Sequence, residues 1–549
     1  MGLLSSIRLE NTNGANLDTR PLEPARRTFG PWEFVTLWVV TGSFNIGGWT
    51  TGSVLIALGL NVWQAVLTVI IGNILVGLLC VLSGAPGAKW HLSFAIIARS
   101  AWGVHGFRFV VIQRVFLACI WFSTQVYWGA QCVRVFLTAL WPSFASLDTS
   151  LAHGTMTSGD MVSFVIFTVL YIPLIWVRPE KYRVMFLISC AAVIPTIFAC
   201  LIWFTVKAQG AGPLVRDSSI SGIPQAHGSH LGWMIVLGIV TNISAMSVHV
   251  YVQSDFTRYA RKPRDQLLAQ LIMVPMGTII VAFIGITCTS CAVAIFPEET
   301  GTLLWEPYTL LSTLQSPYGH SPRSRVAVAF ASLSFMVAQF GMVVVNNGVA
   351  AGLDLAALLP RYFNIRRGML LMVVISFIVQ PWELLNGASK FLSVLSGYGV
   401  FVGPMTGVMF ADYFLVRGRR VRVSHLYEYS PNSIYWYSRG MNMRALVAWV
   451  MGSWLTVPGF VKFVQKGTED PMPGWSNLYY ISYLLGTAVT VVVYVALHYV
   501  WPMPAVVEVD DVEYSSTYEA GSGGRVLDGE EVGSTEVVPI EAKEKHSQA

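Results

Sequence analysis

Residues 43–52 read Ser-Phe-Asn-Ile-Gly-Gly-Trp-Thr-Thr-Gly and lie near the middle of an apolar stretch over residues 32–58. An apolar stretch of this length predicts a helix that crosses a membrane. Asn45 and two adjacent glycines interrupt it, which favours an unwound segment whose free amides and carbonyls could bind a substrate and an ion. Asn45 and Gly47 are therefore candidate binding residues. The alternative is close helix packing through small residues.

The composition of the whole chain supports membrane insertion. Of 549 residues, 54% are hydrophobic and 12% are charged, with a mean hydropathy of +0.57. Soluble domains carry roughly 25% charged residues. The composition excludes an ordinary soluble enzyme, a nucleic-acid-binding protein and a disordered protein. It predicts an all-α protein that crosses the lipid bilayer many times.

Charge is unevenly distributed along the chain. From Glu508 to the C-terminus there are eleven acidic and three basic residues, a net charge of −8. Because the whole chain carries a net charge of +5, the remaining residues carry +13. Residues 502–549 are expected to form an acidic, disordered cytoplasmic tail. Lys543 and Lys545 are candidate ubiquitin acceptors for regulated turnover, and a plain solubilising tail is the alternative.

Hydropathy, together with the polar loop segments that separate the apolar stretches, predicts about twelve membrane-spanning helices. The expected spans are 32–58, 62–84, 109–140, 161–178, 184–206, 231–252, 267–296, 326–350, 368–382, 389–413, 442–461 and 477–500. Loops after even-numbered spans contain most of the lysine and arginine, whereas Arg216 and Lys466 are the clear cases after odd-numbered spans. Because basic loops stay in the cytoplasm, both termini are expected to be cytoplasmic.

Polar side chains at membrane depth indicate a binding site or pathway. In the third span, Trp121 and Gln125 lie four residues apart and therefore share one helical face near the midplane. An indole that stacks on a flat heterocycle, beside an amide that makes a two-point hydrogen bond, suits a planar polar ligand. The alternative is a packed tryptophan with a glutamine that bridges two helices.

The sixth and eighth spans carry further polar residues. His249 could relay a proton, although a buried histidine satisfied by a neighbouring hydroxyl or carbonyl is the alternative. Asn346 and Asn347 are adjacent, so their side chains point about 100° apart and at most one squarely faces a given site. Asp354 lies on the same helical face as Asn347, with a bridge to Arg361 as the alternative.

The sequence contains no set of residues typical of an enzyme. No acid, base and nucleophile converge, and no phosphate-binding loop of the G-x-x-x-x-G-K-[ST] type is present. All seven cysteines fall in apolar stretches, including the Cys288-x-x-Cys291 pair, where small residues suit helix packing. No catalytic activity, metal site or cofactor is expected.

Several motifs, in order from about residue 20 to 500, together resemble the nucleobase–cation symporter family, type one, in its fungal uracil and allantoin permease branch. The motifs are Arg27-Thr-Phe-Gly-Pro-Trp32, Ala57-Leu-Gly-Leu-Asn61, Trp121-x-x-x-Gln125, Asp255-Phe-Thr-Arg-Tyr-Ala260, Leu304-Trp-Glu-Pro-Tyr308, Leu359-Pro-Arg-Tyr-Phe-Asn-Ile-Arg-Arg-Gly368, Gly403-Pro404 and Asp412-Tyr-Phe-Leu-Val-Arg417. Their order and spacing make the resemblance specific.

The resemblance implies an inverted five-plus-five-helix transporter fold with two additional helices. Residues 1–30 would be a cytoplasmic segment, 31–210 the first repeat, 228–414 the inverted second repeat, and 440–501 the two extra helices. The substrate would bind at the midplane between broken spans 1 and 6 and spans 3, 8 and 10. By motif match, Trp121 would stack on the base, Gln125 would hydrogen-bond to it, and Asn347 would be the asparagine of the eighth span.

Several positions depart from the family pattern. Met246 stands where the family often has an aromatic residue on the sixth span, so one face of a stacked sandwich would be replaced by a thioether contact. Gly341 and Met342 stand where sodium-dependent relatives have hydroxyl side chains. Without those hard oxygen ligands a sodium site is poorer, which favours proton coupling.

The resemblance therefore implies a plasma-membrane importer of uracil, allantoin or a similar small heterocycle by cation symport, with a proton as the favoured cation. A nucleoside, nicotinamide riboside or thiamine are alternative substrates. A nutrient receptor of the same fold that binds without transport is the alternative from another class.

Overall fold

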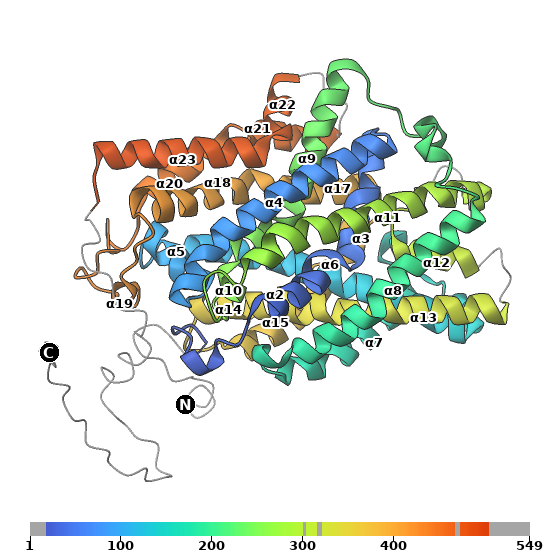
Figure 1. Cartoon of the computed structure of the whole chain (residues 1–549), viewed down its shortest axis with the longest axis horizontal. Helices are drawn as coiled ribbons and strands as arrows, with labels where there is room; N and C mark the ends of the chain where they lie inside the picture. The colour runs from blue at the N-terminus through green and yellow to red at the C-terminus, as the bar shows by residue number, and fades with distance from the viewer. Residues whose placement is uncertain (1–17, 300–302, 316–320, 467–472, 504–549) are drawn as a thin grey trace, which may run out of the picture.

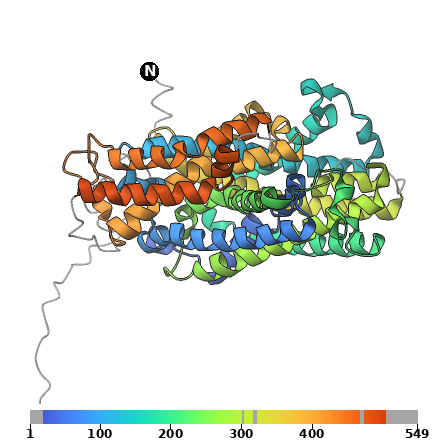
Figure 2. The same ribbon diagram turned by 90° about the horizontal axis from the view of Figure 1, so that it is seen from above.

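The computed structural model describes residues 18–299, 303–315, 321–466 and 473–503 (Figure 1). The predicted acidic tail with Lys543 and Lys545, and residues 1–17 of the predicted N-terminal segment, lie outside the described residues. The described chain is almost entirely helical, and its long helices run side by side along one axis (Figure 2).

The first half of the chain forms helices α2 to α11 and one short β-hairpin, β1–β2. Their bounds are α2 Pro31–Trp38, α3 Ile46–Ser53, α4 Val62–Trp90, α5 Phe94–Trp102, α6 Phe107–Leu140, β1 Ser150–Leu151, β2 Met156–Thr157, α7 Ser158–Tyr171, α8 Arg183–Lys207, α9 Gly228–Tyr251, α10 Ser254–Thr257 and α11 Val274–Ile295.

The second half forms helices α12 to α23. Their bounds are α12 Pro307–Gln315, α13 Pro322–Phe340, α14 Ala350–Leu358, α15 Ile365–Ile378, α16 Pro381–Leu384, α17 Ala388–Gly397, α18 Gly399–Phe410, α19 Val423–Leu426, α20 Met443–Trp454, α21 Val457–Lys466, α22 Pro473–Tyr480 and α23 Ser482–Val500.

Within the described ranges, nine helices are long and apolar enough to cross a membrane. The bent pair Met443–Trp454 and Val457–Gln465 would make a tenth span. The predicted first span is broken into short helices, and the predicted ninth corresponds to α15, which has 14 residues. The fold class is thus confirmed, whereas the count of twelve spans and the exact domain boundaries stay predictions.

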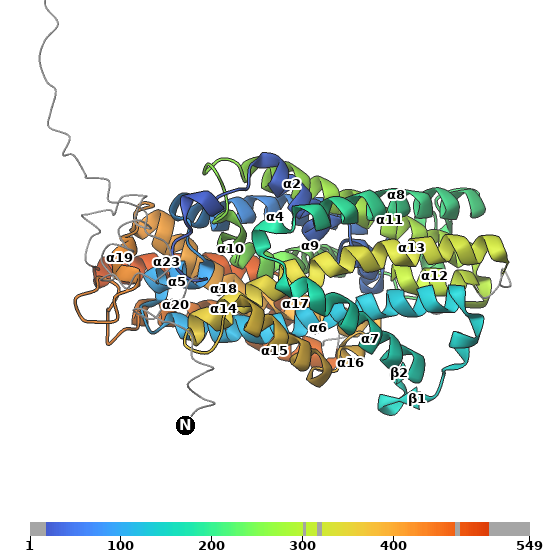
Figure 3. The same cartoon turned by 90° about the horizontal axis from the view of Figure 1, so that it is seen from below.

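The two ends of the molecule are chemically distinct. Both ends of the described chain lie at one end of the molecule, here called the terminal end, because the segment after α18 contacts each: Tyr427 donates to the Thr19 carbonyl, and Arg417 contacts the Met503 sulfur. Helices α5 and α19 lie at this terminal end, and the β1–β2 hairpin lies at the opposite end, here called the hairpin end (Figure 3). Helix α6 runs from the terminal end to the hairpin end.

The predicted interruption of the first span is present, but it falls at Phe44 and Asn45 rather than at the glycines. A π-helical segment, Val39–Ser43, follows α2, and Asn45 is fully extended before α3 begins. Asn45 caps both pieces: its Nδ2 donates to the Val40 carbonyl at 2.8 Å, and its Oδ1 accepts from the Gly48 amide at 2.9 Å. Gly48 is helical, and a Cβ there would overlap the Ser43 carbonyl oxygen.

The predicted sixth and eighth spans are also irregular. Helix α9 ends at Tyr251, and a turn at Val252–Gln253 interrupts the helix before α10 begins. Between α13 and α14 the backbone is π-helical over Gly341–Val349, the segment that contains both asparagines of this span. π-helical turns are rare and occur frequently at functional sites.

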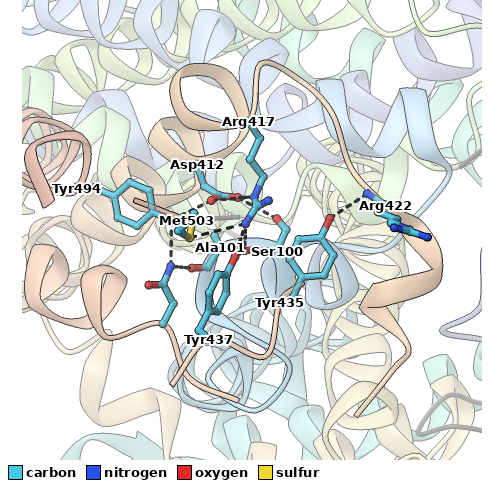
Figure 4. A network of polar contacts seen from close by, with 10 residues as sticks. Ser100, Ala101, Asp412, Arg417, Arg422, Tyr435, Tyr437, Tyr494 and Met503 are labelled. Atoms are coloured by element: carbon cyan, nitrogen blue, oxygen red, sulfur yellow. Dashed lines mark hydrogen bonds and ion pairs between the residues drawn. The ribbon is translucent and has the colours of Figure 1, made fainter. Parts of the chain in front are cut away.

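A buried ion pair joins three elements at the terminal end (Figure 4). Arg417 Nε lies 3.1 and 3.0 Å from the two carboxylate oxygens of Asp412. Asp412 also accepts hydrogen bonds from Tyr494 on α23 and Ser100 on α5. Because the arginine also donates to the Tyr437 hydroxyl, both charges are hydrogen-bonded, as a buried pair requires.

Candidate functional site

The polar face predicted on α6 is buried inside the bundle. Trp121 is 8% exposed and Gln125 is 2% exposed. Gln339 on α13 donates through Nε2 to the Gln125 side-chain carbonyl at 2.9 Å and to its main-chain carbonyl at 3.1 Å. The Gln125 amide nitrogen has no hydrogen-bond partner within the described part of the chain. Gln339 thus orients Gln125 and leaves its NH₂ group available as a donor.

Trp121 faces an aromatic residue that the sequence analysis did not identify. The ring centroids of Trp121 and Tyr398 are 6.0 Å apart, and the planes are inclined by 48°. The Trp121 indole nitrogen and the Tyr398 hydroxyl are buried and have no hydrogen-bond partner among the described residues. Buried polar atoms are normally satisfied, so two unpartnered ones beside an aromatic pair indicate a place for a polar ligand.

The first span contributes backbone to this region rather than side-chain hydrogen-bonding groups. Both polar atoms of the Asn45 side chain are used in capping, as described above. Gly47 lies inside α3 and brings its backbone close to α6, because a Cβ there would lie 3.5 Å from the Trp128 ring. The predicted binding roles of Asn45 and Gly47 stay predictions, and the groups that could bind a ligand there are those of the backbone.

His249 and Asn346 join the sixth and eighth spans. The Asn346 amide nitrogen is in hydrogen-bond contact with His249 Nε2, while His249 Nδ1 is buried without a described partner. Asn347 points elsewhere, since its Nδ2 donates to the Met342 carbonyl at 3.0 Å inside the π-helical segment. The two asparagines therefore face different neighbours, and it is Asn346 that contacts the candidate proton relay.

Met246, the residue in place of the family's aromatic, is half-buried on α9 among otherwise buried neighbours. The aromatic partner of Trp121 comes from another span, because Tyr398 stands between α17 and α18. No described contact places Met246 against Trp121. The stacking role of Met246 stays a prediction.

A second buried cluster lies toward the terminal end of the same helices. Asp354 on α14 forms an ion pair with Arg114 on α6, both less than 4% exposed. The alternative bridge from Asp354 to Arg361 is therefore wrong, because the partner is two turns below Trp121 on α6 rather than in the following loop. Arg114 also acts electrostatically on Asp255, which accepts from the Phe94 amide.

Aromatic side chains close the region at the hairpin end. Trp305 stacks on Phe391 of α17 with centroids 5.1 Å apart, and Phe391 contacts Trp128 of α6 edge-on at 5.7 Å. The Trp305 carbonyl accepts from Ser53 at the end of α3 at 2.6 Å. The structure is therefore closed over Gln125 on this side.

A groove of about 580 Å³ lies on the other side of Tyr398, but its chemistry differs from that of the buried region. Its lining is almost wholly apolar and includes Ile112 and Phe116, which are 59% and 65% exposed. Exposed apolar side chains of this kind face lipid in a membrane protein. The groove is therefore a lipid-facing surface rather than a site for a polar ligand.

The region around Trp121 offers amides, an indole and a phenol, and the charged groups near it are paired. This chemistry suits a neutral, planar ligand with hydrogen-bonding edges. No group of three or more metal-ligating side chains occurs among the residues that the structure describes.

Three residues of the region were missed from the sequence: Gln339, Tyr398 and Arg114. The sequence signal that could have identified each of them is a polar or aromatic side chain inside an apolar span. Arg114 follows Gln113 in span 3, Gln339 is an isolated polar residue in span 8, and Tyr398 lies between Gly397 and Gly399, where small residues allow close packing. Their partners lie far away in sequence, so their roles needed the tertiary structure.

Comparison with known proteins identifies the family of the chain. Residues 21–486 match a family described as permeases for cytosine and purines, uracil, thiamine and allantoin. The chain is 32% identical to the uridine permease of Saccharomyces cerevisiae over 91% of this chain and 76% of that protein. It is also 32% identical to the allantoin permease of the same yeast, over 91% of this chain and 78% of that one.

The solved structures that resemble this fold include a transporter of the nucleobase–cation symport-1 family, Mhp1. Its closed form with bromovinylhydantoin bound gives a TM-score of 0.67 at 17% identity, covering 92% of this chain and all of that one. Its inward-facing form gives 0.65 at 18% identity, covering 93% and 99%. The chain described here belongs to the permease family for cytosine and purines, uracil, thiamine and allantoin.

Proposed function

We propose that this permease imports a neutral, planar heterocycle of the uracil or allantoin type by proton symport across the plasma membrane. The observation that carries the proposal is the buried face of α6: the Trp121 indole nitrogen has no partner among the described residues, and Gln339 occupies the Gln125 side-chain carbonyl but not its NH₂ group. The identity of 32% to uracil, uridine and allantoin permeases of yeast is equal among the three and does not choose between them.

The binding mode follows from two distances. A flat ring held between Trp121 and Tyr398 needs two contacts of about 3.5 Å, hence roughly 7 Å between the aromatic planes. The centroids are 6.0 Å apart and the planes are inclined by 48°, so the two rings must separate further and turn toward parallel for a substrate ring to enter. Because Tyr398 follows directly after α17, binding would displace α17, the helix whose Phe391 also closes the hairpin end.

The orientation rests on the charge of the loops. The terminal end carries the basic segments after α10 and after α18, which include Arg258, Arg261, Arg417 and Arg419. By the positive-inside rule this end faces the cytoplasm, with both termini inside and the hairpin end outside. Lysines of the cytoplasmic tail would then be accessible for ubiquitin-dependent turnover.

The proton is proposed as the coupled cation for a chemical reason. The positions five and six residues before Asn347 are Met342 and Gly341, which supply a thioether and no side chain. Sodium prefers hard oxygen ligands, so this site is poor for that ion. His249, in contact with Asn346, is the proposed relay.

The test is uptake of a radiolabelled panel in transporter-deficient cells at pH 5 and 7.5, with and without a protonophore. The panel is uracil, allantoin, uric acid, uridine, nicotinamide riboside and thiamine. Accumulation of uracil or allantoin that collapses with the protonophore supports the proposal.

Each other outcome contradicts one part of it. Accumulation of uridine, nicotinamide riboside or thiamine would replace the substrate class, and dependence on sodium would replace the cation. Binding of a compound without accumulation would identify a receptor of the same fold.

A further inference from the structure

Glu306 is a buried carboxyl at the hairpin end, in the segment that closes the substrate region. Its side chain is 6% exposed, and its Oε1 atom has no hydrogen-bond partner among the described residues. It lies between Trp305, which stacks on Phe391, and the start of α12 at Pro307. A carboxyl in such a place cannot stay ionised without a compensating charge.

No compensating charge reaches Glu306 from the described residues of the surrounding helices. The other buried carboxyls of the described chain are Asp160, Asp255, Asp354 and Asp412, and each has an arginine acting on it or paired with it. On Glu306 the acting group is the hydroxyl of Tyr308, a neutral donor. Glu306 therefore differs in kind from the structural ion pairs.

The titratable and charged groups around Glu306 come from several elements. Helix α6 contributes Tyr127, which interacts electrostatically with Glu306; Arg134 acts on Tyr127, and Cys132 acts on Tyr308. Arg134 is already neutralised by Asp160 of α7 at 2.8 Å. Lys390, beside Phe391 on α17, is exposed to solvent.

The segment that carries Glu306 is hydrogen-bonded to three of the surrounding helices, α3, α11 and α6. The Trp305 carbonyl accepts from Ser53 of α3 at 2.6 Å, and the Leu304 carbonyl accepts from Thr289 of α11 at 3.0 Å. Gln315 of α12 donates to the Val135 carbonyl of α6 at 3.3 Å. Any movement that admits substrate from this end disturbs the surroundings of Glu306.

We propose that Glu306 is the proton-binding group of the outer closure: the segment from Leu304 to Gln315 shuts over the substrate site with Glu306 protonated, and the carboxyl ionises when the segment lifts and water reaches it. Closing takes one proton from the outer solution, and reopening returns it to the same side. The inference rests on the proposed orientation of the permease. The inference concerns the protonation that accompanies the outer closure, and not the number of protons transported with each substrate molecule.

The expected pH dependence has a definite sign. Burial raises the pKa of Glu306 from its ordinary value of 4.5 to about 8, so the closed form binds the proton more tightly than the open form. Between these two values, each unit of rising pH weakens closure by up to about tenfold. Above about pH 8 both forms are ionised and the dependence ends.

An introduced thiol beneath the closure reports its opening without any substrate. Thr51 lies on α3 one turn beyond Gly47, whose face points at Trp128, and before Ser53, which holds Trp305. In intact cells, a membrane-impermeant thiol reagent is applied to Thr51→Cys at pH 5 to 8. The same measurement on Thr51→Cys combined with Glu306→Gln corrects for the thiol's own pH dependence, and the unsubstituted chain measures the background of the native cysteines.

Relative to the control that also carries Glu306→Gln, labelling of Thr51→Cys should increase severalfold or more from pH 5 to 8. Glu306→Asp should keep a pH dependence. Equal pH profiles with and without Glu306→Gln overturn the inference, and so does an absence of labelling at every pH in both, because the segment then does not lift. If no compound of the panel is transported while labelling still depends on Glu306, the proposed function fails and this inference stands.

Discussion

Replacing Gln125 by alanine tests the site most directly, because the structure assigns the two halves of its amide to different partners. The carbonyl is held by Gln339 at 2.9 Å, and the NH₂ group has no hydrogen-bond partner among the described residues. Gln125→Ala therefore removes a donor to the substrate. It also leaves the Gln339 amide without its side-chain acceptor.

The size of the effect follows from hydrogen-bond energetics. A lost hydrogen bond costs about 0.5–1.5 kcal/mol, and a buried ligand group left unpaired costs about 1–3 kcal/mol. Together these costs are about 1.5–4.5 kcal/mol, which corresponds to a decrease in kcat/KM of roughly 12- to 1,600-fold, at about 1.4 kcal/mol per factor of ten. Gln339→Ala loses only the orienting bond, about 1 kcal/mol or roughly fivefold.

A double-mutant cycle separates the two roles. Initial uptake rates of the transported compound are measured for Gln125→Ala, Gln339→Ala and the double variant, each corrected for surface protein by biotinylation. If Gln339 acts through Gln125, adding Gln339→Ala to the Gln125→Ala variant should change kcat/KM by less than a factor of about two.

Two results would refute this reasoning. Uptake by Gln125→Ala within about threefold of the parent, at equal surface expression, would remove Gln125 from the site, because the lost hydrogen bonds predict a larger effect. Fully additive effects of the two substitutions would show that Gln339 acts independently, and the hydrogen bond between them would then have no role in binding.

Three further substitutions test other contacts. Trp121→Ala should lower kcat/KM by more than about tenfold whereas Trp121→Phe should be milder, because a phenyl ring still stacks; equal losses in uptake assays would argue against stacking. If His249 relays the proton, His249→Gln should flatten the pH profile of uptake, and an unchanged profile contradicts the relay. Arg417→Met should destabilise the detergent-solubilised protein by about 3–5 kcal/mol, because Asp412 keeps an uncompensated buried charge, and the measurement is a lower thermal midpoint. Adding Asp412→Asn to the Arg417→Met variant should restore part of the lost stability. A thermal midpoint of Arg417→Met equal to the parent's would show that the ion pair is dispensable.

Much of the architecture can be predicted from local sequence. Apolar runs of about 20 residues lead to helices because lipid offers the backbone no hydrogen-bond partners. The interruption near Asn45 was predictable for a similar reason, since an asparagine can cap the helix pieces on both sides with its own side chain. The shared face of Trp121 and Gln125 follows from helical geometry alone.

The local reasoning was wrong where packing decides the conformation. Asn45 and the two adjacent glycines were together expected to unwind the first span, yet of these three residues the break includes Asn45 only, and Gly47 and Gly48 are helical because the missing side chain of Gly48 lets α3 begin against the Ser43 carbonyl. Asp354 was open to pairing with Arg361, seven residues away. Its partner is Arg114, which the fold brings in from another span.

The sequence by itself therefore determined the membrane-spanning helices, the break at the first span and the polar face of α6, since each depends on neighbours within a few residues. Only the tertiary structure decided which groups remain available for function. Gln339 orients Gln125 from 214 residues away, Tyr398 supplies the second ring, and Glu306 is left without a cation among the described residues. The physical reason is that burial and pairing of a polar group are set by whatever the fold packs against it, which no local pattern specifies.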